Sequence, residues 1–406
     1  MKRIIISLCL CFFGMTVFAQ NMSYYTNEYM RPDGSFSHRL IILETIRQEG
    51  ISGIGEFYHD ALKFLLLRAP DIRDRTERDA AEKSAIILCQ GLGAEKFTNA
   101  APELWHTAEV FDVVRDANDG NTMQAALIAL GQVNGKDFLP QIVQRLNNYN
   151  AQTYRNAETR RRVQMAVIGC IYALESFRDI SGYRPVFFTS NGSYDTSVKQ
   201  IARDALPNIV DDPGEIISAI IIDASSDPSV KLLAWNEMLR TRAPDSSKAK
   251  VAAAALSTGW IYTTSNRNFV ANLSSMRKSA IDTIRQVGVA DNSVYDFLER
   301  SYSRNFISNS PDYDEIMLTL NALAAVGSDE AVELLMKFLR ELNDRRRIGP
   351  WGNKETQVFQ WVVSCLGATR TQSSEARLLL NRIQHSSDYT PREQTRAGDA
   401  LNMLTR

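Results

Sequence analysis

Apolar residues recur at intervals of three and four positions along most of the chain, and residues 316–342 show the pattern clearly. The first apolar face there comprises Ile316, Leu320, Leu323 and Ala324. The second comprises Val332, Leu335, Phe338, Leu339 and Leu342. Such spacing is typical of amphipathic α-helices. Between the two faces, Gly327 can adopt the left-handed conformation that ends a helix, and Ser328 can cap the next one. The stretch therefore predicts two helices joined by a tight corner.

The same helix–corner–helix pattern recurs along the chain. The residues that close the successive first helices are Leu92, Val133, Leu174, Leu206, Leu239, Val287, Val326 and Leu366. By subtraction, these anchors are 41, 41, 32, 33, 48, 39 and 40 residues apart. A looser pair near Ile46 and a closing helix, "PREQTRAGDALNML", fit the same pattern. Two-helix repeats of this length predict an α-solenoid, whereas a helical bundle with ordinary amphipathicity is the alternative.

The units resemble HEAT or HEAT-like repeats over most of residues 39–405. The resemblance lies in the first helices "ALIALG", "NALAAVG" and "VVSCLG", in the short and often acidic corners, and in the leucine-rich second helices. It implies an all-α solenoid of stacked antiparallel helix pairs, with about eight or nine units. It also implies protein binding on an extended curved surface. The Leu206 and Leu239 units are shorter than the pattern, and the step to Val287 contains an insertion, "TGWIYTTSNRNF".

The first residues differ from the repeats. Lys2 and Arg3 precede an apolar run from Ile4 to Val17, and Ala19 follows where a signal peptidase cleaves. This arrangement predicts a secretory signal peptide over residues 1–19, cleaved after Ala19. A membrane anchor is the alternative, but the run is shorter than the roughly 20 residues that a span needs. We therefore expect an extended segment over residues 20–38, repeats over 39–406, no transmembrane segment in the mature chain, and a periplasmic or secreted location.

Charge and motifs indicate no catalytic chemistry. Lys and Arg number 46 against 47 Asp and Glu, so the chain has no bulk positive field to attract nucleic acid. Zinc-ligand spacing, a P-loop, a nucleophile elbow and a third glycine for a nucleotide fingerprint are all missing from the sequence. We expect no catalytic residue, no cofactor and no metal. Three cysteines, Cys89, Cys170 and Cys365, fall on apolar first helices, which indicates small buried hydrophobes.

Arginine groups and aromatic segments are the candidates for partner binding. The groups Arg160–Arg162 and Arg345–Arg347, like the arginines of "DIRDRTERD", follow a second helix and precede the next first helix. In a solenoid such connections share one edge, and arginine with aromatic side chains suits a protein partner. Two long connections contain further aromatic residues, in "YRPVFF" and "GWIYTT". These two stretches are also the best candidates for strands. The predicted partner-binding residues are Arg160, Arg161, Arg162, Arg345, Arg346, Arg347, Trp351, Phe188 and Trp260.

Plainer interpretations exist for both features. Acidic residues among the arginines are consistent with a solvated edge of mixed charge, and the rings can fold back over an exposed repeat face. The sequence nonetheless favours an exported, non-catalytic scaffold or adaptor of the bacterial envelope, which binds a protein of unknown identity on its concave second-helix surface. The alternative function is recognition of envelope polysaccharide or peptidoglycan by the aromatic connections. Catalysis would need carboxylates brought together from separate repeats.

Overall fold

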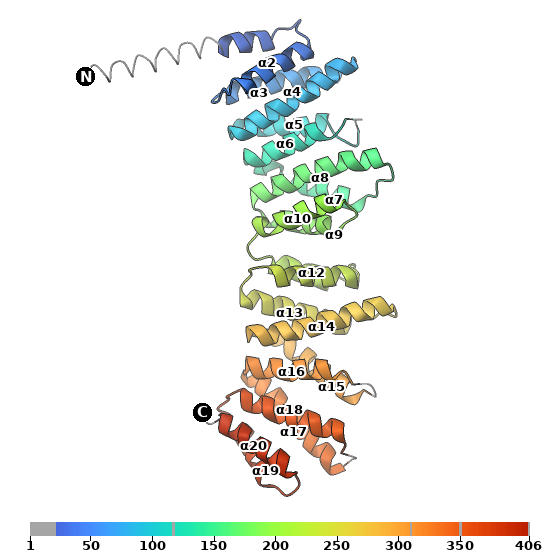
Figure 1. Cartoon of the computed structure of the whole chain (residues 1–406), viewed down its shortest axis with the longest axis vertical. Coiled ribbons are helices and arrows are strands. Elements are labelled where there is room, and N and C mark those ends of the chain that lie inside the picture. Colours follow the sequence, from blue (N-terminus) through green and yellow to red (C-terminus); the bar gives the residue numbers. More distant parts are fainter. Residues whose placement is uncertain (1–21, 116–117, 309–310, 349–350, 405–406) are drawn as a thin grey trace, which may run out of the picture. The chain divides into compact units, whose positions relative to one another are not determined.

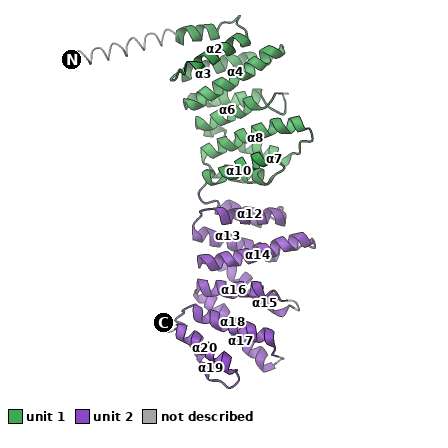
Figure 2. Cartoon of the chain, in the orientation of Figure 1, with its two compact units in different colours: residues 1–210 green, residues 211–406 purple. Residues whose placement is uncertain are grey.

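The computed structural model describes residues 22–115, 118–308, 311–348 and 351–404. These residues form helices and connections, with no strand among them (Figure 1). The chain divides into two compact units, residues 1–210 and residues 211–406 (Figure 2). The predicted signal peptide, residues 1–19 with cleavage after Ala19, lies outside the described residues.

In unit 1, alternate helices form two layers. The first-helix layer consists of α2 (Phe36–Gln48), α4 (Arg75–Ala94), α6 (Asn121–Gln132), α8 (Ala157–Phe177) and α10 (Thr196–Ile209). Each of these helices packs on the next, and the helices of a second layer pack against them. That layer consists of α3 (Gly55–Arg68), α5 (Ala101–Val110), α7 (Leu139–Ala151) and α9 (Tyr183–Asn191).

Unit 2 repeats the arrangement. Its first-helix layer consists of α12 (Pro228–Arg240), α14 (Arg267–Val287), α16 (Tyr313–Val326), α18 (Asn353–Ala368) and α20 (Pro391–Leu404). Its second-helix layer consists of α11 (Gly214–Ile222), α13 (Asp245–Ile261), α15 (Tyr295–Ile307), α17 (Asp329–Ile348) and α19 (Ser374–His385). Successive first helices pack together, as do α11 with α13, α13 with α15, and α15 with α17.

Short 3₁₀ turns lead into several helices. They are η1 (Ala69–Asp71), η2 (Thr98–Ala100), η3 (Lys136–Phe138), η4 (Ile180–Gly182) and η5 (Asn292–Val294). Four of them, η2 to η5, end immediately before a second helix. Each therefore belongs to the corner that separates the two helices of a pair.

The helix ends confirm the repeat. Val287 and Val326 are the last residues of α14 and α16, and Gly288 and Gly327 cap these helices with φ of 65° and 60°. In that left-handed region a residue with a Cβ atom is strained, which is why glycine occurs at both corners. The predicted fold class is confirmed: each unit is an all-α stack of HEAT-like helix pairs.

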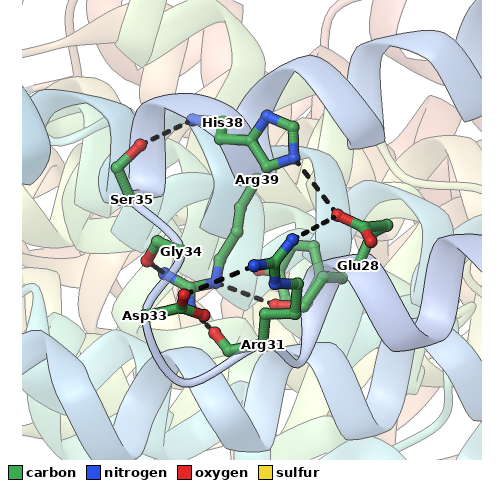
Figure 3. A network of polar contacts seen from close by, with 8 residues as sticks. Glu28, Arg31, Asp33, Gly34, Ser35, His38 and Arg39 are labelled. Carbon is green, nitrogen blue, oxygen red and sulfur yellow. Dashed lines mark hydrogen bonds and ion pairs between the residues drawn. The ribbon is translucent and has the colours of Figure 1, made fainter.

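The segment before α2 differs from the extended conformation expected for residues 20–38. Residues 22–29 form a helix, and α2 begins at Phe36. Arg39, only 2% exposed, holds the intervening turn, as Figure 3 shows. Its guanidinium donates to the carbonyl oxygens of Tyr29 at 2.8 Å and Arg31 at 2.5 Å, and also to that of Gly34. This helix and turn were not predictable from the sequence, because one side chain from the following helix closes the turn.

Of the two aromatic connections, the first is helical and the second only partly so, because residues 262–266 join α13 to α14 without a helix. Tyr183 to Phe188 lie in α9, and Trp260 lies in the last turn of α13. Pro185 is compatible with the helix because it falls in the first turn, where the backbone N–H has no helical partner. The arginine groups also lie within helices: Arg160–Arg162 near the start of α8, and Arg345–Arg347 in the last turn of α17.

Candidate binding surfaces on the second helices

A groove runs along the second-helix face of unit 1. It has a volume of about 560 Å³ and lies between α5, the segment that follows α5, and α7. Its lining combines one tryptophan, two tyrosines, two arginines and several side-chain amides. The aromatic, charged and amide residues of the lining are Trp105, Asp112, Arg115, Gln141, Gln144, Arg145, Asn148, Tyr149, Gln152 and Tyr154.

Trp105 and Arg145 are held rigidly at the groove floor. The indole of Trp105 stacks on the ring of Phe138, with centroids 5.6 Å apart and planes 19° apart. The guanidinium of Arg145 lies 4.9 Å from the Trp105 ring centroid and donates to Asp112 Oδ2 at 2.9 Å. Because the Arg145 and Asp112 side chains are only 17% and 14% exposed, water screens this ion pair little. The arrangement offers a preorganised aromatic and cationic anchor.

Amide side chains line the wall along α7. Gln141, Gln144 and Asn148 recur three and four residues apart, so they share one exposed face of the helix. Gln144 Nε2 donates to Asn148 Oδ1 at 2.9 Å, and Gln152 follows the helix end. A side-chain amide both donates and accepts hydrogen bonds, as a peptide group does. This wall therefore suits the main chain of a polypeptide.

A second hollow of about 270 Å³ continues from the groove. The two share Tyr149, Gln152 and Tyr154, and the second hollow adds Arg160 and Tyr194. Arg160 Nε and Nη2 each donate to the carbonyl oxygen of Tyr154 at 3.2 Å. One predicted residue, Arg160, thus lines this hollow together with Tyr149, Tyr154 and Tyr194.

Asn150 fixes the wall of this second hollow. Its Oδ1 accepts hydrogen bonds from Thr189 Oγ1 and from the Tyr194 hydroxyl, both at 3.0 Å. Its Nδ2 donates to the carbonyl oxygen of Pro185 at 2.9 Å. Burial raises the pKa of Tyr194 well above its ordinary value, so its hydroxyl stays protonated and keeps its hydrogen bond to Asn150.

The other predicted residues of unit 1 do not line the hollows. Arg161 is exposed on α8, and Arg162 is half-buried beside Thr159. Phe188 is half-buried on α9, with its ring 5.5 Å from that of Phe187 and 5.7 Å from the Arg184 guanidinium. The ring of Phe188 is packed among neighbours on a helix rather than presented by a loop.

The side chain of Arg346 in unit 2 is enclosed by other side chains and is not presented to a partner. Its guanidinium lies 4.3 Å from the ring of Trp351, 4.8 Å from Tyr389 and 5.5 Å from Phe359. Its Nη2 donates to Glu393 Oε1 at 2.5 Å, and the Glu393 side chain is fully buried. Arg346 and Trp351 therefore contribute to packing between repeats, while Arg345 and Arg347 are exposed.

Trp260 is likewise engaged within unit 2. Its Nε1 donates to Ser301 Oγ at 2.7 Å, and the guanidinium groups of Arg277 and Arg304 lie 4.2 and 5.6 Å from its ring centroid. The alternative function, polysaccharide recognition, required rings projecting from loops. Both Phe188 and Trp260 sit on helices with their rings in contact with neighbouring side chains.

Unit 2 carries its own groove on the second helices. A hollow of about 590 Å³ lies along α15 and α17. Its lining includes Tyr295, Asp329, Glu330, Glu333, Lys337 and Arg340. This groove is more acidic than the one in unit 1, although each lies on the second helices of its own unit. These linings were not predictable from the sequence, because a single tryptophan or glutamine on an amphipathic helix is typical of ordinary core or surface.

Comparisons with known proteins provide no family. No protein-family model matches the chain, and no curated protein matches it in sequence. Human deoxyhypusine hydroxylase in complex with glycerol is 13% identical, with a TM-score of 0.24, over 87% of this chain and 98% of that one. Importin beta in a polyethylene glycol condition is 11% identical, with a TM-score of 0.33, over 95% of this chain and 54% of that one. At these values neither similarity indicates what this chain binds or catalyses.

The described residues also bear on two other classes of site. They contain no group of three or more His, Cys, Asp or Glu side chains placed to hold a metal ion. No helix within them combines the length and the apolar character needed to cross a membrane.

Proposed function

We propose that this chain is a helical-repeat scaffold that binds a polypeptide partner along its second-helix face. The groove of unit 1 carries the proposal, because it joins a fixed tryptophan–arginine anchor to a wall of amides and a second, aromatic hollow. Tryptophan, tyrosine and arginine dominate the energetics of protein interfaces. The partner enters as a segment that places an apolar side chain beside the Trp105–Phe138 stack and its main chain along α7.

A polypeptide suits this groove better than a sugar. Sugar rings stack on an open aromatic face, but the Trp105 ring already contacts Phe138 and Arg145. The amides of Gln144 and Gln152 remain exposed on the wall, and Arg115 is exposed at the rim. A segment with a carboxylate near its apolar anchor therefore complements the groove.

Site-specific photo-crosslinking tests the proposal. A photoreactive phenylalanine at Gln144 is expected to capture a defined protein in cells, whereas the same residue at Tyr172, on first helix α8, is not. The captured protein, once purified, should bind the wild-type chain directly. Binding should weaken about tenfold or more in Trp105→Ala or Arg115→Glu, with thermal unfolding measured on each variant. Arg73→Glu, an exposed change away from the groove, is the matched control.

Equal capture from Gln144 and Tyr172 would contradict the proposal. So would a purified partner whose affinity is the same for the wild-type chain and both groove variants.

The location of the scaffold is part of the proposal. The apolar run after Lys2 and Arg3 supports export to the bacterial envelope, with residues 1–19 removed. Mass spectrometry of the chain from a periplasmic or secreted fraction should find Gln20 as its first residue. An intact N-terminus in the cytoplasmic fraction would refute export without affecting the groove.

A further inference from the structure

Exposed isoleucines occupy the same position in consecutive repeats of unit 2. Ile222, Ile261, Ile307 and Ile348 are the last residues of α11, α13, α15 and α17. Their exposed fractions are 62%, 63%, 67% and 86%. By subtraction they are 39, 46 and 41 residues apart, which is the repeat length. We call these four residues the isoleucine row.

Contacts between successive helix ends place the row along one edge. Thr258 of α13 donates through Oγ1 to the carbonyl oxygen of Ile221 at 3.4 Å, which joins the ends of α11 and α13. The guanidinium of Arg304 lies 5.6 Å from the ring centroid of Trp260, which joins the last turns of α13 and α15. The guanidinium of Arg345 lies 4.8 Å from the ring of Phe306, which joins the ends of α15 and α17. Each of these contacts involves residues within a turn of an exposed isoleucine.

Basic side chains lie close in sequence to two of the four isoleucines. Arg304 lies three residues before Ile307, and Arg345 and Arg347 lie just before Ile348. All three arginines are exposed, as is Arg267 at the start of α14. Asp344 is the acidic residue among them, and Asp223 follows Ile222 at the other end of the row. An arginine in the last turn of a helix interacts favourably with the helix dipole, but the dipole does not explain the exposed isoleucines.

The spacing of the isoleucines indicates which secondary structure of a partner could bind along the row. Adjacent packed helices lie about 8–10 Å apart. A helical partner rises about 1.5 Å per residue, so its every seventh residue, about 10.5 Å on, meets the next isoleucine on nearly the same face. An extended strand presents the same face about every 6.7 Å and does not match. Spanning the whole row takes about 16–20 helical residues.

We propose that the isoleucine row of unit 2 is a second docking edge, which binds an acidic amphipathic helix of a partner protein with apolar residues at heptad spacing. The partner's apolar residues pack between successive isoleucines, and its carboxylates face Arg304, Arg345 and Arg347. This surface is distinct from the groove of unit 1, and it gives the exposed members of the predicted Arg345–Arg347 group a role that enclosed Arg346 cannot have.

An anionic membrane shares part of this chemistry but fits less well. Each repeat contributes one apolar side chain to the row, flanked by polar residues such as Thr263 and Ser308. A peripheral membrane helix buries a continuous apolar face, which a single file of isoleucines does not provide. Membrane binding is accordingly an outcome that the test distinguishes.

The test uses a labelled synthetic helix and the full-length mature chain. The probe is a peptide of about 21 residues with leucine at heptad positions a and d and glutamate at e and g, where like charges oppose self-association. Its binding is measured by fluorescence anisotropy at low and high salt. A peptide with lysine in place of glutamate, and vesicles of phosphatidylcholine with phosphatidylglycerol, are the comparison probes.

The variants change only exposed side chains. The double variant Ile307→Ser/Ile348→Ser and the double variant Arg345→Ser/Arg347→Ser should each weaken binding of the acidic peptide by about tenfold or more. Val270→Ser, whose side chain is 50% exposed on first helix α14, should bind as the wild-type chain does. The arginine variant should also reduce the salt dependence of binding, because screening acts on exposed charges.

Several results would overturn the proposal. They are failure of the wild-type chain to bind the acidic peptide at low salt, equal affinity for the lysine peptide, binding unchanged in both double variants, and vesicle binding that depends on the row. Loss of groove binding in Trp105→Ala has no bearing on the row, so the two proposals fail independently.

Discussion

Arg346 shows how an arginine that the sequence suggests is exposed can instead be enclosed by other side chains of the fold. It lies in "NDRRRIGPW", where the adjacent arginines and Asp344 suggest a solvated surface. In the structure three aromatic rings surround its guanidinium, and its ion-pair partner Glu393 is fully buried. The flanking residues Arg345 and Arg347 point to solvent instead, because adjacent residues on a helix lie about 100° apart. Helical phase therefore separates a structural arginine from two candidate contact residues.

Replacing Arg346 by Met should strongly destabilise unit 2. The change leaves the Glu393 carboxylate buried without its cation, and breaking such a pair costs about 3–5 kcal/mol. Arg347→Met, an exposed change one residue away, should fall within about 0.5 kcal/mol of the wild-type chain. Chemical denaturation at neutral pH measures both. Equal stability of the two variants would show that the enclosure of Arg346 contributes nothing.

The pH dependence of this pair has a definite sign. Burial alone raises the pKa of Glu393, but hydrogen bonds from Arg346 and Thr390 outweigh it and hold the pKa below its ordinary value. The pairing therefore stabilises the fold fully above the unfolded pKa of about 4.3, and this contribution is lost as pH falls through the lower folded pKa. In Arg346→Met the buried carboxyl prefers its proton, so the stability gap to the wild-type chain should narrow between neutral pH and pH 4. A gap that is constant over this range would contradict the assignment.

The cysteines provide a second prediction for individual residues. Cys89 and Cys170 are 0% exposed and Cys365 is 6% exposed, and all three are free thiols, as the sequence predicted. Burial raises the pKa of each thiol to about 12. A chain that begins at Gln20 should react with a disulfide reagent at pH 8 at least about a hundredfold more slowly when native than in concentrated guanidinium chloride, because the thiolate is the reacting form. A native rate close to the denatured one would mean that the first helices open readily.

Close approach between first helices depends on glycine. A Cβ atom at Gly367 of α18 would lie 2.7 Å from both Cα and Cβ of Ala400 on α20. The same atom at Gly398 of α20 would meet the side-chain amide of Gln384 at 2.9 Å, and that flexible group can move. The two helices thus contact each other closely at one glycine but not at the other.

The paired substitutions should have different effects on stability. Gly367→Ala should destabilise by about 1–3 kcal/mol through overpacking, despite the better helix propensity of alanine. Gly398→Ala should be neutral or stabilising by up to about 1 kcal/mol, because propensity then dominates. Thermal and chemical denaturation compare the two. A stabilising Gly367→Ala would show that α18 and α20 are less closely packed than the structure has them.

The first helices were predictable from the sequence, and the second helices much less so. Anchors such as Val287 and Val326 are followed by glycines whose left-handed conformation ends the helix, and this is a local signal. In contrast, α9 has a strand-like composition, yet it forms a helix. It follows η4 directly and packs against α7 and α10. Tertiary packing overrides propensity in such short elements.

The candidate surfaces were predictable only in part, for a related reason. The sequence singled out Arg160, and the structure brings it to Tyr154 and Tyr194 at one hollow. Neither Trp105 nor the isoleucine row was singled out from the sequence. Whether a ring or an isoleucine at the end of a helix is covered depends on the next repeat, about 40 residues away. The sequence revealed the period of these contacts, but not which side chains meet.

At the scale of the whole molecule, stability should be shared between neighbours rather than held within each pair. The pair α16/α17 illustrates this. The Phe338 ring on α17 stacks 3.8 Å from Tyr302 on α15, and the fully buried Glu315 on α16 bonds Arg277 on α14 at 3.1 Å. Both contacts leave the pair, so excising it exposes an aromatic face and strips a buried carboxylate of its cation. A solenoid unit has this property because it buries its second face only on another unit.

An excised fragment of residues 311–348 should therefore be largely unfolded in water, with little helical circular dichroism and no cooperative melting. Extending it to residues 267–406 restores α14, α15 and α18 to α20, and this fragment should fold with a sigmoidal transition. The comparison isolates the contribution of the neighbours, because the sequence of α16 and α17 is the same in both fragments. Cooperative folding of the short fragment alone would mean that the pair is a self-sufficient domain. The surfaces proposed here, which depend on helix ends held by the next repeat, would then lose their physical basis.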